Sequence, residues 1–300
     1  MLKTTKDLKK MYPWLNINTT VEEYVEASYY NRILKEYIFN NKTDLEYFKD
    51  WFSNNFHKNS SVLELGCGTG RVSELALELA SDSHSLTLLD LSNQMLNFTQ
   101  DKFKNHNHIN YINSDSIDFL WETKKTYDLV YSLWSFSHSI HQILTANGFN
   151  KGKEYVQGGL NKFLKENLKR ESSFFLIHFD SQSSEQKILI NQWKKVFPIF
   201  DNHNQQSPSK LLIDEELNKL KEERVIDFTS SHFIGKPIVY ASENEALETF
   251  MNFHMESYFN ESELVLDIIS ELKNYFKNYT NDLGEISIPP GCFIYNIKRI

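Results

Sequence analysis

The residues with the clearest capacity for ligand chemistry lie in segment 62–70, which reads VLELGCGTG. Strand-forming residues lead through Glu64 into a G-x-G-x-G loop, and strong helix formers follow over residues 71–80. A strand, glycines and a helix start place bare backbone and helix amides beside a ligand. The spacing is one residue shorter than the G-x-G-x-x-G that surrounds a pyrophosphate in dinucleotide-binding enzymes. The shorter loop, with an acid at its start, favours a cofactor that has no phosphate and carries an α-amino group. A glycine-rich turn without a ligand is the alternative.

A second motif begins twenty positions after the loop, where the apolar run 86–89 ends in Asp90. In nucleoside-binding α/β folds, an acid at the end of the second strand accepts hydrogen bonds from both ribose hydroxyls. Asp90 opens the pattern D-x-S-x-x-M-L, in which Ser92 is a natural N-cap for the next helix. An ordinary strand-end acid is the alternative for Asp90 taken alone. The two motifs in this order favour a nucleoside site.

Together the two motifs resemble those of the class I S-adenosylmethionine-dependent methyltransferases. The resemblance implies that S-adenosylmethionine is the cofactor, with Glu64 near its α-amino group and Asp90 on its ribose. The other residues that we expect beside the cofactor here are Gly66, Cys67, Gly68, Leu91 and Met95.

A third segment continues the resemblance in the same order. After a predicted strand over residues 109–112, Asp115 stands where the family carries an acid that reads the adenine amino group. The backbone amides of Ser116 or Ile117 would face the adenine ring nitrogens. An Asp followed by Ser is also a common helix start, which is the alternative for Asp115.

A fourth segment, residues 127–133, matches a strand of F-D-x-V type in the family, whose end supplies a carbonyl near the cofactor amine. Ser132 and Leu133 match that end. In relatives the next residues face the transferred methyl group, which makes His138 the candidate general base and Trp134 a candidate wall. Histidine titrates near neutrality, and a base is needed only if the nucleophile arrives protonated. A helix-capping or surface histidine is the alternative.

Two regions are candidates to close over this site. They are the N-terminal helices and the insertion before the last strand, which cover the active site in related small-molecule methyltransferases. Tyr30 and Arg32, in the first region, are candidate ligands for the methionine carboxylate. His178, at the end of the fifth predicted strand, and Phe233, in an aromatic-rich stretch, are candidate substrate contacts. Packing of the covering layer is the alternative for these side chains.

The wider pattern predicts an α/β fold. Short apolar strands alternate with helical stretches, which is typical of a doubly wound, mostly parallel sheet with helices on both faces, here of seven strands. We expect an N-terminal helical lid over residues 1–57, a cofactor-binding core over 58–182, a substrate-side insertion over 183–283 and a terminal strand region over 284–300. Segments 225–233 and 236–241 resemble a hairpin.

Composition narrows the possible partners. The net charge of −8 argues against bulk nucleic-acid binding, which needs a basic face. The sequence has no apolar run of membrane-spanning length, and its basic first residues are not followed by an apolar stretch, so we expect neither a membrane span nor a secretory leader. Two cysteines form neither a disulfide framework nor a metal cluster. We therefore expect a cytoplasmic monomer or homodimer without a metal.

Three functions are compatible with the sequence. The one favoured is transfer of a methyl group from S-adenosylmethionine to nitrogen or oxygen of a small metabolite, by in-line displacement. The second is methylation of RNA or protein, which predicts a basic groove or an N-P-P-Y type motif; residues 132–135 read SLWS instead. The third is a non-catalytic protein that binds S-adenosylmethionine.

Overall fold

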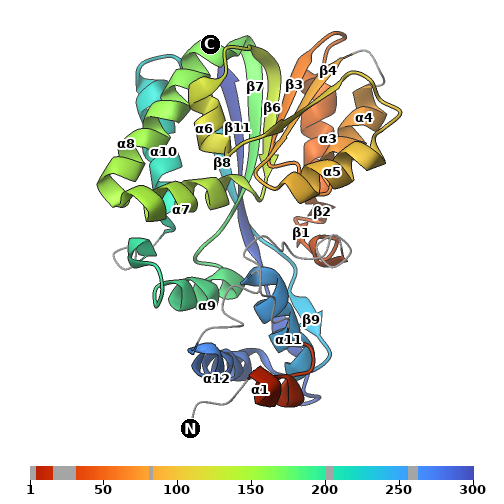
Figure 1. The fold of residues 1–300 in the computed structure, drawn as a ribbon, viewed down its shortest axis with the longest axis vertical. Coiled ribbons are helices and arrows are strands. Elements are labelled where there is room, and N and C mark those ends of the chain that lie inside the picture. Colours follow the sequence, from red (N-terminus) through yellow and green to blue (C-terminus); the bar gives the residue numbers. More distant parts are fainter. Residues whose placement is uncertain (1–4, 16–31, 81–83, 201–205, 256–262) are drawn as a thin grey trace.

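The computed structural model describes residues 5–15, 32–80, 84–200, 206–255 and 263–300. Within these ranges a seven-stranded sheet forms the upper part of the molecule in Figure 1, with helices on both of its faces. A smaller layer of helices and short strands lies below the sheet. The predicted α/β doubly wound fold is confirmed.

The sheet has the strand order β5-β4-β3-β6-β7-β11-β8. Its strands are β3 (Ser61–Leu65), β4 (Ser85–Asp90), β5 (Ile109–Asn113), β6 (Tyr127–Leu133), β7 (Leu168–Phe179), β8 (Ile226–Ile234) and β11 (Gly291–Arg299). β3 to β7 pair in parallel, whereas β11 is antiparallel to both β7 and β8. The order reverses between β3 and β6, and ligands of open α/β sheets bind beyond the carboxyl ends at such a point.

Two apolar cores lie on opposite faces of the sheet, because successive strand residues point to opposite sides. Val62 packs into the core shared with helices α3 (Asp44–Asn55), α4 (Arg71–Ala80) and α5 (Asn93–Lys102). Leu63 packs into the other core. That core is covered by α6 (Ser116–Glu122), α7 (Phe136–Asn147), α8 (Phe149–Lys162) and α10 (Pro208–Glu222). A π-helical turn, η1 (Phe163–Asn167), leads from α8 into β7.

The smaller layer combines segments that are far apart in the sequence. It contains α1 (Thr5–Met11), α9 (Ser184–Trp193), β9 (Ile238–Tyr240), α11 (Glu243–Thr249), η3 (Phe250–His254), α12 (Val265–Phe276), η4 (Lys277–Tyr279) and β10 (Ile286–Ile288). Asn252 donates its amide to the carbonyl of Trp14 at 2.8 Å, which joins the N-terminal segment to the insertion. Strands β1 (Ile38–Phe39) and β2 (Lys42–Thr43) lead from the N-terminal segment into α3, and η2 (Pro198–Phe200) follows α9.

The predicted hairpin of residues 225–233 and 236–241 is wrong. β8 pairs with β11 at the edge of the main sheet, and β9 pairs with β10 in the smaller layer. The link between them does not close a turn, because its amides bond elsewhere: Gly235 donates to the carbonyl of Pro290 and Lys236 to that of Ile38, both at 2.8 Å. A strand within the predicted substrate-side region therefore completes the core sheet.

Candidate functional site

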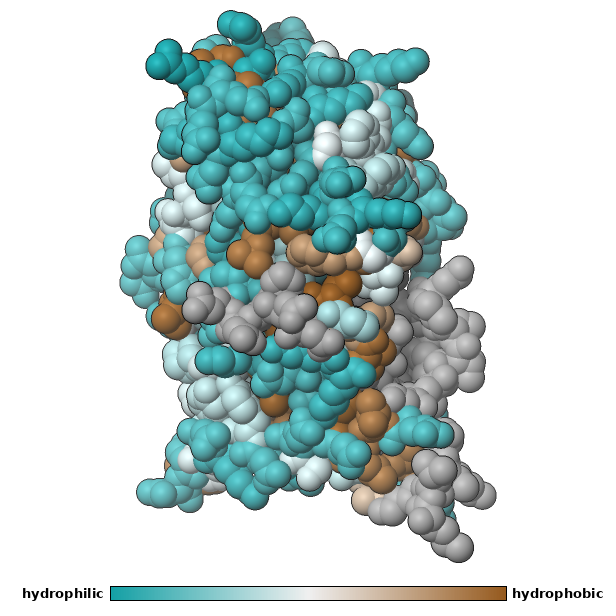
Figure 2. Space-filling model, turned by 90° about the vertical axis from the view of Figure 1, so that its left-hand side faces the viewer, coloured by the Kyte–Doolittle hydropathy of each residue, from teal (hydrophilic) through white to brown (hydrophobic). Residues whose placement is uncertain are grey.

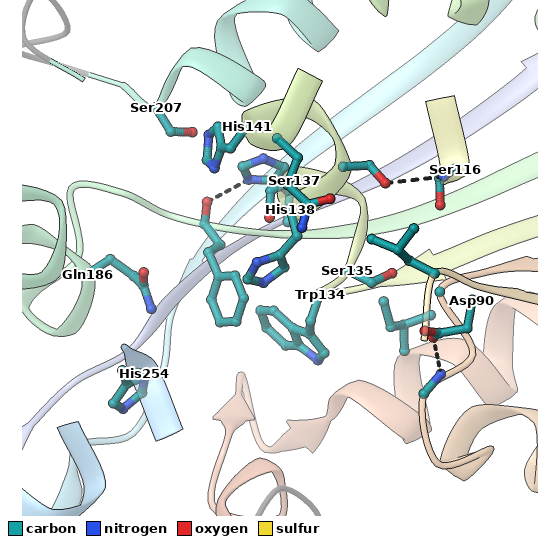
Figure 3. Close-up of a pocket in the computed structure, with 18 of the residues that line it drawn as sticks. Asp90, Ser116, Trp134, Ser135, Ser137, His138, His141, Gln186, Ser207 and His254 are labelled. Carbon is teal, nitrogen blue, oxygen red and sulfur yellow. Dashed lines mark hydrogen bonds between the residues drawn. The ribbon is translucent and has the colours of Figure 1, made fainter. Parts of the chain in front are cut away.

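A cavity of about 570 Å³ lies between the carboxyl ends of the parallel strands and the smaller layer. Asp90 and Ser116 lie toward one end of it, His254 and Gln186 toward the other, and Trp134 and His138 between them (Figure 3). Figure 2 shows hydrophobic side chains gathered at mid-height on one side of the molecule, between more polar upper and lower parts. We call the part lined by residues 64–71 and Asp90 the glycine-loop end, and the part lined by His138, His141, His178 and His254 the histidine end.

The glycine loop joins β3 to α4 in a conformation that residues with a side chain rarely adopt. Gly66 and Gly68 have φ angles of +77° and +51°. The amides of Gly66 and Cys67 donate to the carbonyl of Leu89 at 2.9 Å each, which holds the loop against β4. A Cβ atom on Gly66 would lie 2.2 Å from Oγ of Ser135, whereas one on Gly68 would have no atom within 4 Å. Gly66 is therefore required by packing, and Gly68 keeps the space beside it open.

We expect Gly66→Ala to destabilise the protein much more than Gly68→Ala. Both place a side chain at positive φ, which costs about 1 kcal/mol. Gly66→Ala also collides with Ser135, and overpacking of this kind adds about 2 kcal/mol. Urea denaturation should show a loss of about 3 kcal/mol for the first variant and about 1 kcal/mol for the second. Equal losses would show that the contact with Ser135 does not constrain the loop.

Asp90 ends β4 and lines the glycine-loop end with a carboxylate that is fixed by backbone donors. Its Oδ2 accepts from the amide of Gly68 at 2.8 Å, and its Oδ1 accepts from the amide of Ser92 at 2.9 Å. Burial raises the pKa of Asp90, and these amides oppose the rise. The predicted N-cap is confirmed, since Ser92 accepts from the amide of Met95 at 3.3 Å. A carboxylate has about four lone-pair sites, so Asp90 retains acceptors for two hydroxyl donors.

Glu64 is buried in β3 and lines the same end of the cavity. The hydroxyls of Ser73 and Tyr131 both donate to its Oε2, the second at 3.0 Å. Burial raises the pKa of Glu64 to about 8, although the two hydroxyls act in the opposite direction. A buried carboxyl in this state gains most from a cationic partner. Its geometry suits the predicted ammonium contact, which stays a prediction.

Some of the other residues predicted to contact the cofactor line the cavity, and others do not. Those that line the cavity are Gly66, Cys67, Gly68, Leu91, Met95, Ser116 and Leu133. Asp115 and Ile117 are not among the described residues that line it. Asp115 caps α6, accepting from the amides of Ile117 at 2.7 Å and Asp118 at 3.4 Å. The helix-start role of Asp115 is thus present in the structure, and its adenine contact stays a prediction.

The cationic side chain at the glycine-loop end is Arg71, which the motif reading did not assign. Of the two predicted carboxylate ligands, Tyr30 lies outside the described residues and Arg32 is exposed away from the cavity lining. Arg71 begins α4 and pairs with buried Asp44, with Nη1 3.1 Å from Oδ1. The indole of Trp134 donates to Oδ2 of Asp44 at 2.7 Å. A basic residue in the first turn opposes the helix dipole, and this was the available signal in the sequence.

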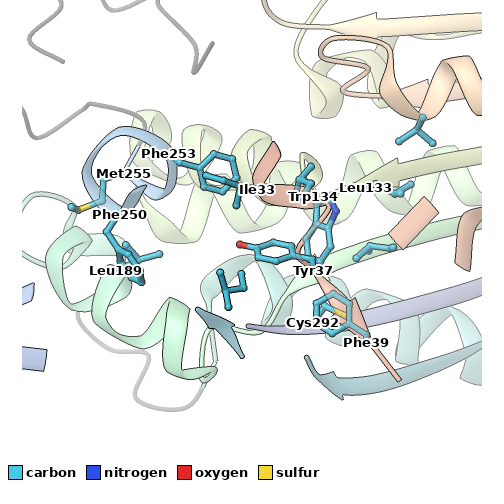
Figure 4. Close-up of a cluster of buried hydrophobic side chains, with 14 of the residues drawn as sticks. Ile33, Tyr37, Phe39, Leu133, Trp134, Leu189, Phe250, Phe253, Met255 and Cys292 are labelled. Atoms are coloured by element: carbon cyan, nitrogen blue, oxygen red, sulfur yellow. The ribbon is translucent and has the colours of Figure 1, made fainter. Parts of the chain in front are cut away.

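Trp134 lines the middle of the cavity, and its contact with a substrate stays a prediction. Its φ of +69° is rare for a bulky side chain, and such strain collects at functional sites. The bond to Asp44 and three aromatic neighbours hold the indole in place. Its ring centroid lies 5.5 Å from that of Tyr37 and 6.1 Å from that of Phe39 (Figure 4). It lies 4.6 Å from the ring centroid of Phe179.

The predicted residues of the histidine end occupy contrasting environments. His138 lines the cavity near the start of α7 and is exposed. His178 lines it from β7 and is fully buried, with Nδ1 2.7 Å from the carbonyl of Phe179 and Nε2 2.9 Å from Oγ of Ser209. Burial lowers the pKa of His178 to about 4, so its ring is neutral at neutral pH. Phe233 is not among the described lining residues and packs against a ring of α3 instead.

Most of the histidine end was not assigned from the sequence. Its further lining residues include His141, Gln142, Gln186, Ile190, Trp193, Phe197, Phe200, Ser207, Phe253 and His254. They come from α7, α9, η2, η3 and the segments beside them, and these elements carry no recognisable motif. The aromatic density of the insertion was the available signal. Among the described residues, no group of three or more His, Cys, Asp or Glu side chains is arranged to hold a metal ion.

Comparison with known proteins gives one family match and several similar folds. Residues 62–149 match a family model described as a methyltransferase domain. No curated protein matches the chain closely enough to count as a relative. The structure of YcgJ from Bacillus subtilis is similar, with a TM-score of 0.50 and 13% identity, over 85% of this chain and 98% of that chain.

Two further solved structures lie just below that level of similarity. The [4+2]-cyclase SpnF has a TM-score of 0.49 and 10% identity, over 99% of this chain and 98% of that chain. An S-adenosylmethionine-dependent methyltransferase from Thiobacillus denitrificans, in complex with S-adenosylhomocysteine, has a TM-score of 0.44 and 12% identity, over 85% and 90% of the two chains. At these identities the likeness concerns the fold alone.

The family match covers the part of the chain that builds the glycine-loop end. Residues 62–149 contain the glycine loop, Asp90 and the strand that ends at Leu133. They also contain both buried acids that face the cavity. Open space beside Gly68 and two carboxylates suit a cationic nucleoside cofactor without phosphate. The chain carries a methyltransferase domain over residues 62–149.

Proposed function

We propose that the enzyme transfers a methyl group from S-adenosylmethionine to nitrogen or oxygen of a small metabolite. The observation that supports this most is the continuity of one cavity from the glycine-loop end to the histidine end. Its volume of about 570 Å³ is in the range of small-molecule sites. Two ligands bound in the two ends would lie in one cavity, which is what a direct transfer requires.

At the glycine-loop end the proposed roles follow the contacts. Asp90 accepts the ribose hydroxyls, and Glu64 accepts from the ammonium group of the methionine moiety. The bare backbone of Gly66 and Gly68 permits close approach, and Leu91 and Met95 flank the nucleoside. Bound S-adenosylmethionine supplies an electrophilic methyl group on a sulfonium sulfur, so the protein mainly positions the partner and excludes water.

At the histidine end the protein orients the acceptor. Trp134 lies between the two ends and gives a flat surface against which an acceptor ring can pack. His138 is the proposed general base for an acceptor that arrives protonated, and its exposure gives the proton a route to solvent. His178 contributes a neutral ring to the wall, since both of its nitrogens already have partners.

Methyl transfer from a deuterated donor tests the proposal directly. The purified protein is incubated with S-adenosylmethionine labelled in its methyl group and, in separate reactions, with the small-molecule, RNA and heat-denatured protein fractions of a cell extract, and mass spectrometry follows the label. We expect label in a small molecule, and none with an Asp90→Ala variant at the same donor concentration. Label in the RNA or protein fraction would show that the acceptor is RNA or protein and not a small metabolite. Binding of the donor without transfer would indicate a non-catalytic protein.

We further propose a cytoplasmic monomer or homodimer. Both cysteines, Cys67 and Cys292, are buried free thiols, which is compatible with a reducing compartment. Within the described ranges, the helices are too short or too polar to cross a membrane. Fractionation of cells and light scattering of the purified protein would test the location and the oligomeric state.

A further inference from the structure

The histidine end of the cavity has no charged side chain among the described residues that line it. The described lining residues with an acidic or strongly basic side chain are Glu64, Arg71 and Asp90, and all three belong to the glycine-loop end. An ionised ligand group that leaves water needs a partner of opposite charge. The apolar part of the histidine end is rich in rings, with Phe179, Trp193, Phe197, Phe200 and Phe253. This end therefore favours an uncharged ligand with a flat apolar body.

His254 is a polar side chain of this end whose hydrogen bonding is incomplete. It closes η3, a single π-helical turn, and such turns are frequent at functional sites. The side chain is 2% exposed, yet it lines the cavity. Among the residues that the structure describes, its Nε2 has no hydrogen-bond partner. Buried polar atoms without a partner are rare and costly, which makes a ligand the natural partner.

The contacts of the neighbouring Glu185 explain why it does not accept a hydrogen bond from Nε2 of His254. Its Oε1 lies 3.5 Å from Nε2 of His254 and already accepts the hydroxyl of Tyr37 at 2.8 Å. Its Oε2 accepts from the side-chain amide of Gln186 at 3.2 Å. Tyr37 is itself fixed between Trp134 and the cluster around Phe253 (Figure 4). Burial lowers the pKa of His254 to about 3, so the ring is neutral at neutral pH.

We propose that the methyl acceptor is an uncharged, largely aromatic molecule with a hydroxyl group that hydrogen-bonds to His254. A neutral imidazole has one donor and one acceptor nitrogen, and a hydroxyl group can satisfy either one. Among the described residues that line this end, a carboxylate would meet no cation and an ammonium group no carboxylate. The inference rests on the proposed function and narrows its acceptor class.

A matched set of ligands measures the contribution of the hydroxyl group. The protein is loaded with S-adenosylhomocysteine, and calorimetry gives the Kd of 1-naphthol, naphthalene and 1-naphthoate. We expect 1-naphthol to bind about tenfold more tightly than the other two. We define the preference for 1-naphthol as the Kd of naphthalene divided by the Kd of 1-naphthol. His254→Phe keeps a ring beside Phe250 and Phe253, and in this variant the preference should fall to about one while the Kd of naphthalene stays unchanged.

Two other variants separate a ligand contact from a packing role. Tyr37→Phe keeps the ring and frees Oε1 of Glu185 to accept from His254, so the preference for 1-naphthol should fall about threefold or more. It also serves if His254→Phe does not fold. His57→Phe, at an exposed histidine before β3, should leave the preference unchanged.

Several results would overturn the inference. They are an unchanged preference in His254→Phe or Tyr37→Phe, tighter binding of 1-naphthoate than of 1-naphthol, and no binding of 1-naphthol by the loaded wild-type protein. In each of these cases S-adenosylhomocysteine still binds, and the proposed methyl transfer stands with another acceptor. Failure of the wild-type protein to bind S-adenosylhomocysteine would instead overturn the proposed function.

Discussion

Replacing Asp90 by alanine should weaken the binding of S-adenosylhomocysteine by about 100-fold. The expected loss comes from the two ribose hydroxyls that we assign to its carboxylate at the glycine-loop end of the cavity. A hydrogen bond to a charged group contributes about 1.5 kcal/mol or more, and about 1.4 kcal/mol is a factor of ten in Kd. Titration calorimetry on the purified protein gives the two Kd values.

Further variants separate this loss from a general loss of structure. Asp90 also accepts from the amides of Gly68 and Ser92, so alanine lowers stability as well. Asp90→Asn keeps the size and one acceptor, and we expect about tenfold weaker binding. Asp101→Asn, at an exposed acid of α5, should bind as the wild-type protein does. Full affinity in Asp90→Ala would show that the ribose does not lie at the end of β4.

Replacing Glu64 by glutamine should change cofactor affinity and stability in opposite directions. Glutamine keeps an oxygen for the hydroxyls of Ser73 and Tyr131 but cannot ionise. The ammonium group of S-adenosylhomocysteine then loses a buried carboxylate, so at a pH above about 8 we expect binding to weaken about tenfold or more.

The effect on stability follows from the sign of the pKa shift. Burial raises the pKa of Glu64 from 4.5 to about 8, so the folded state binds more protons than the unfolded state between these values. The free energy of unfolding therefore falls as the pH rises through this window. Glutamine does not titrate, so the free energy of unfolding of Glu64→Gln should exceed that of the wild-type protein by an amount that grows across the window to about 2 kcal/mol. The pKa shift of Glu64 sets an upper limit of about 5 kcal/mol on this difference.

Proton uptake and release give an independent measurement of the same group. At neutral pH the wild-type protein should release a proton when S-adenosylhomocysteine binds, because the ammonium group favours the ionised carboxyl. Calorimetry in two buffers of different ionisation enthalpy measures that proton, which Glu64→Gln should not release. Equal proton release and equal affinity in both proteins would place the ammonium group away from Glu64.

The residues of the glycine-loop end could be predicted from the sequence because they interact within short segments of the chain. Gly66 takes a positive φ within one strand-loop-helix unit, and Asp90 ends the adjacent strand. Ser92 caps the helix that follows. Each of these roles depends on residues within one unit of the fold, so the spacing of residue types carries the information. Arg71 lies in the same unit, and its partner Asp44 on α3 could not be read from a motif.

Most residues of the histidine end could not be predicted from the sequence because their contacts join segments that are far apart in the chain. Tyr37 and Glu185 are 148 positions apart, and no local pattern marks their hydrogen bond. The false hairpin has the same origin, because the pairing of β8 depends on β11 near the end of the chain. Helices α9 and α10 also form in this part of the chain, with Ser183 and Ser207 as N-caps.

The hydrogen bond between Tyr37 and Glu185 has a consequence for the order of folding. Closing a longer loop costs more conformational entropy, so contacts between near segments form before contacts between remote ones. Residues 61–133, which carry the parallel strands β3 to β6, can assemble their ligand-binding edge early. The Tyr37–Glu185 contact, together with His254, closes only after β7 has joined the sheet and the chain has returned through η3. The glycine-loop end of the cavity is thus expected to exist in a folding intermediate in which the histidine end does not.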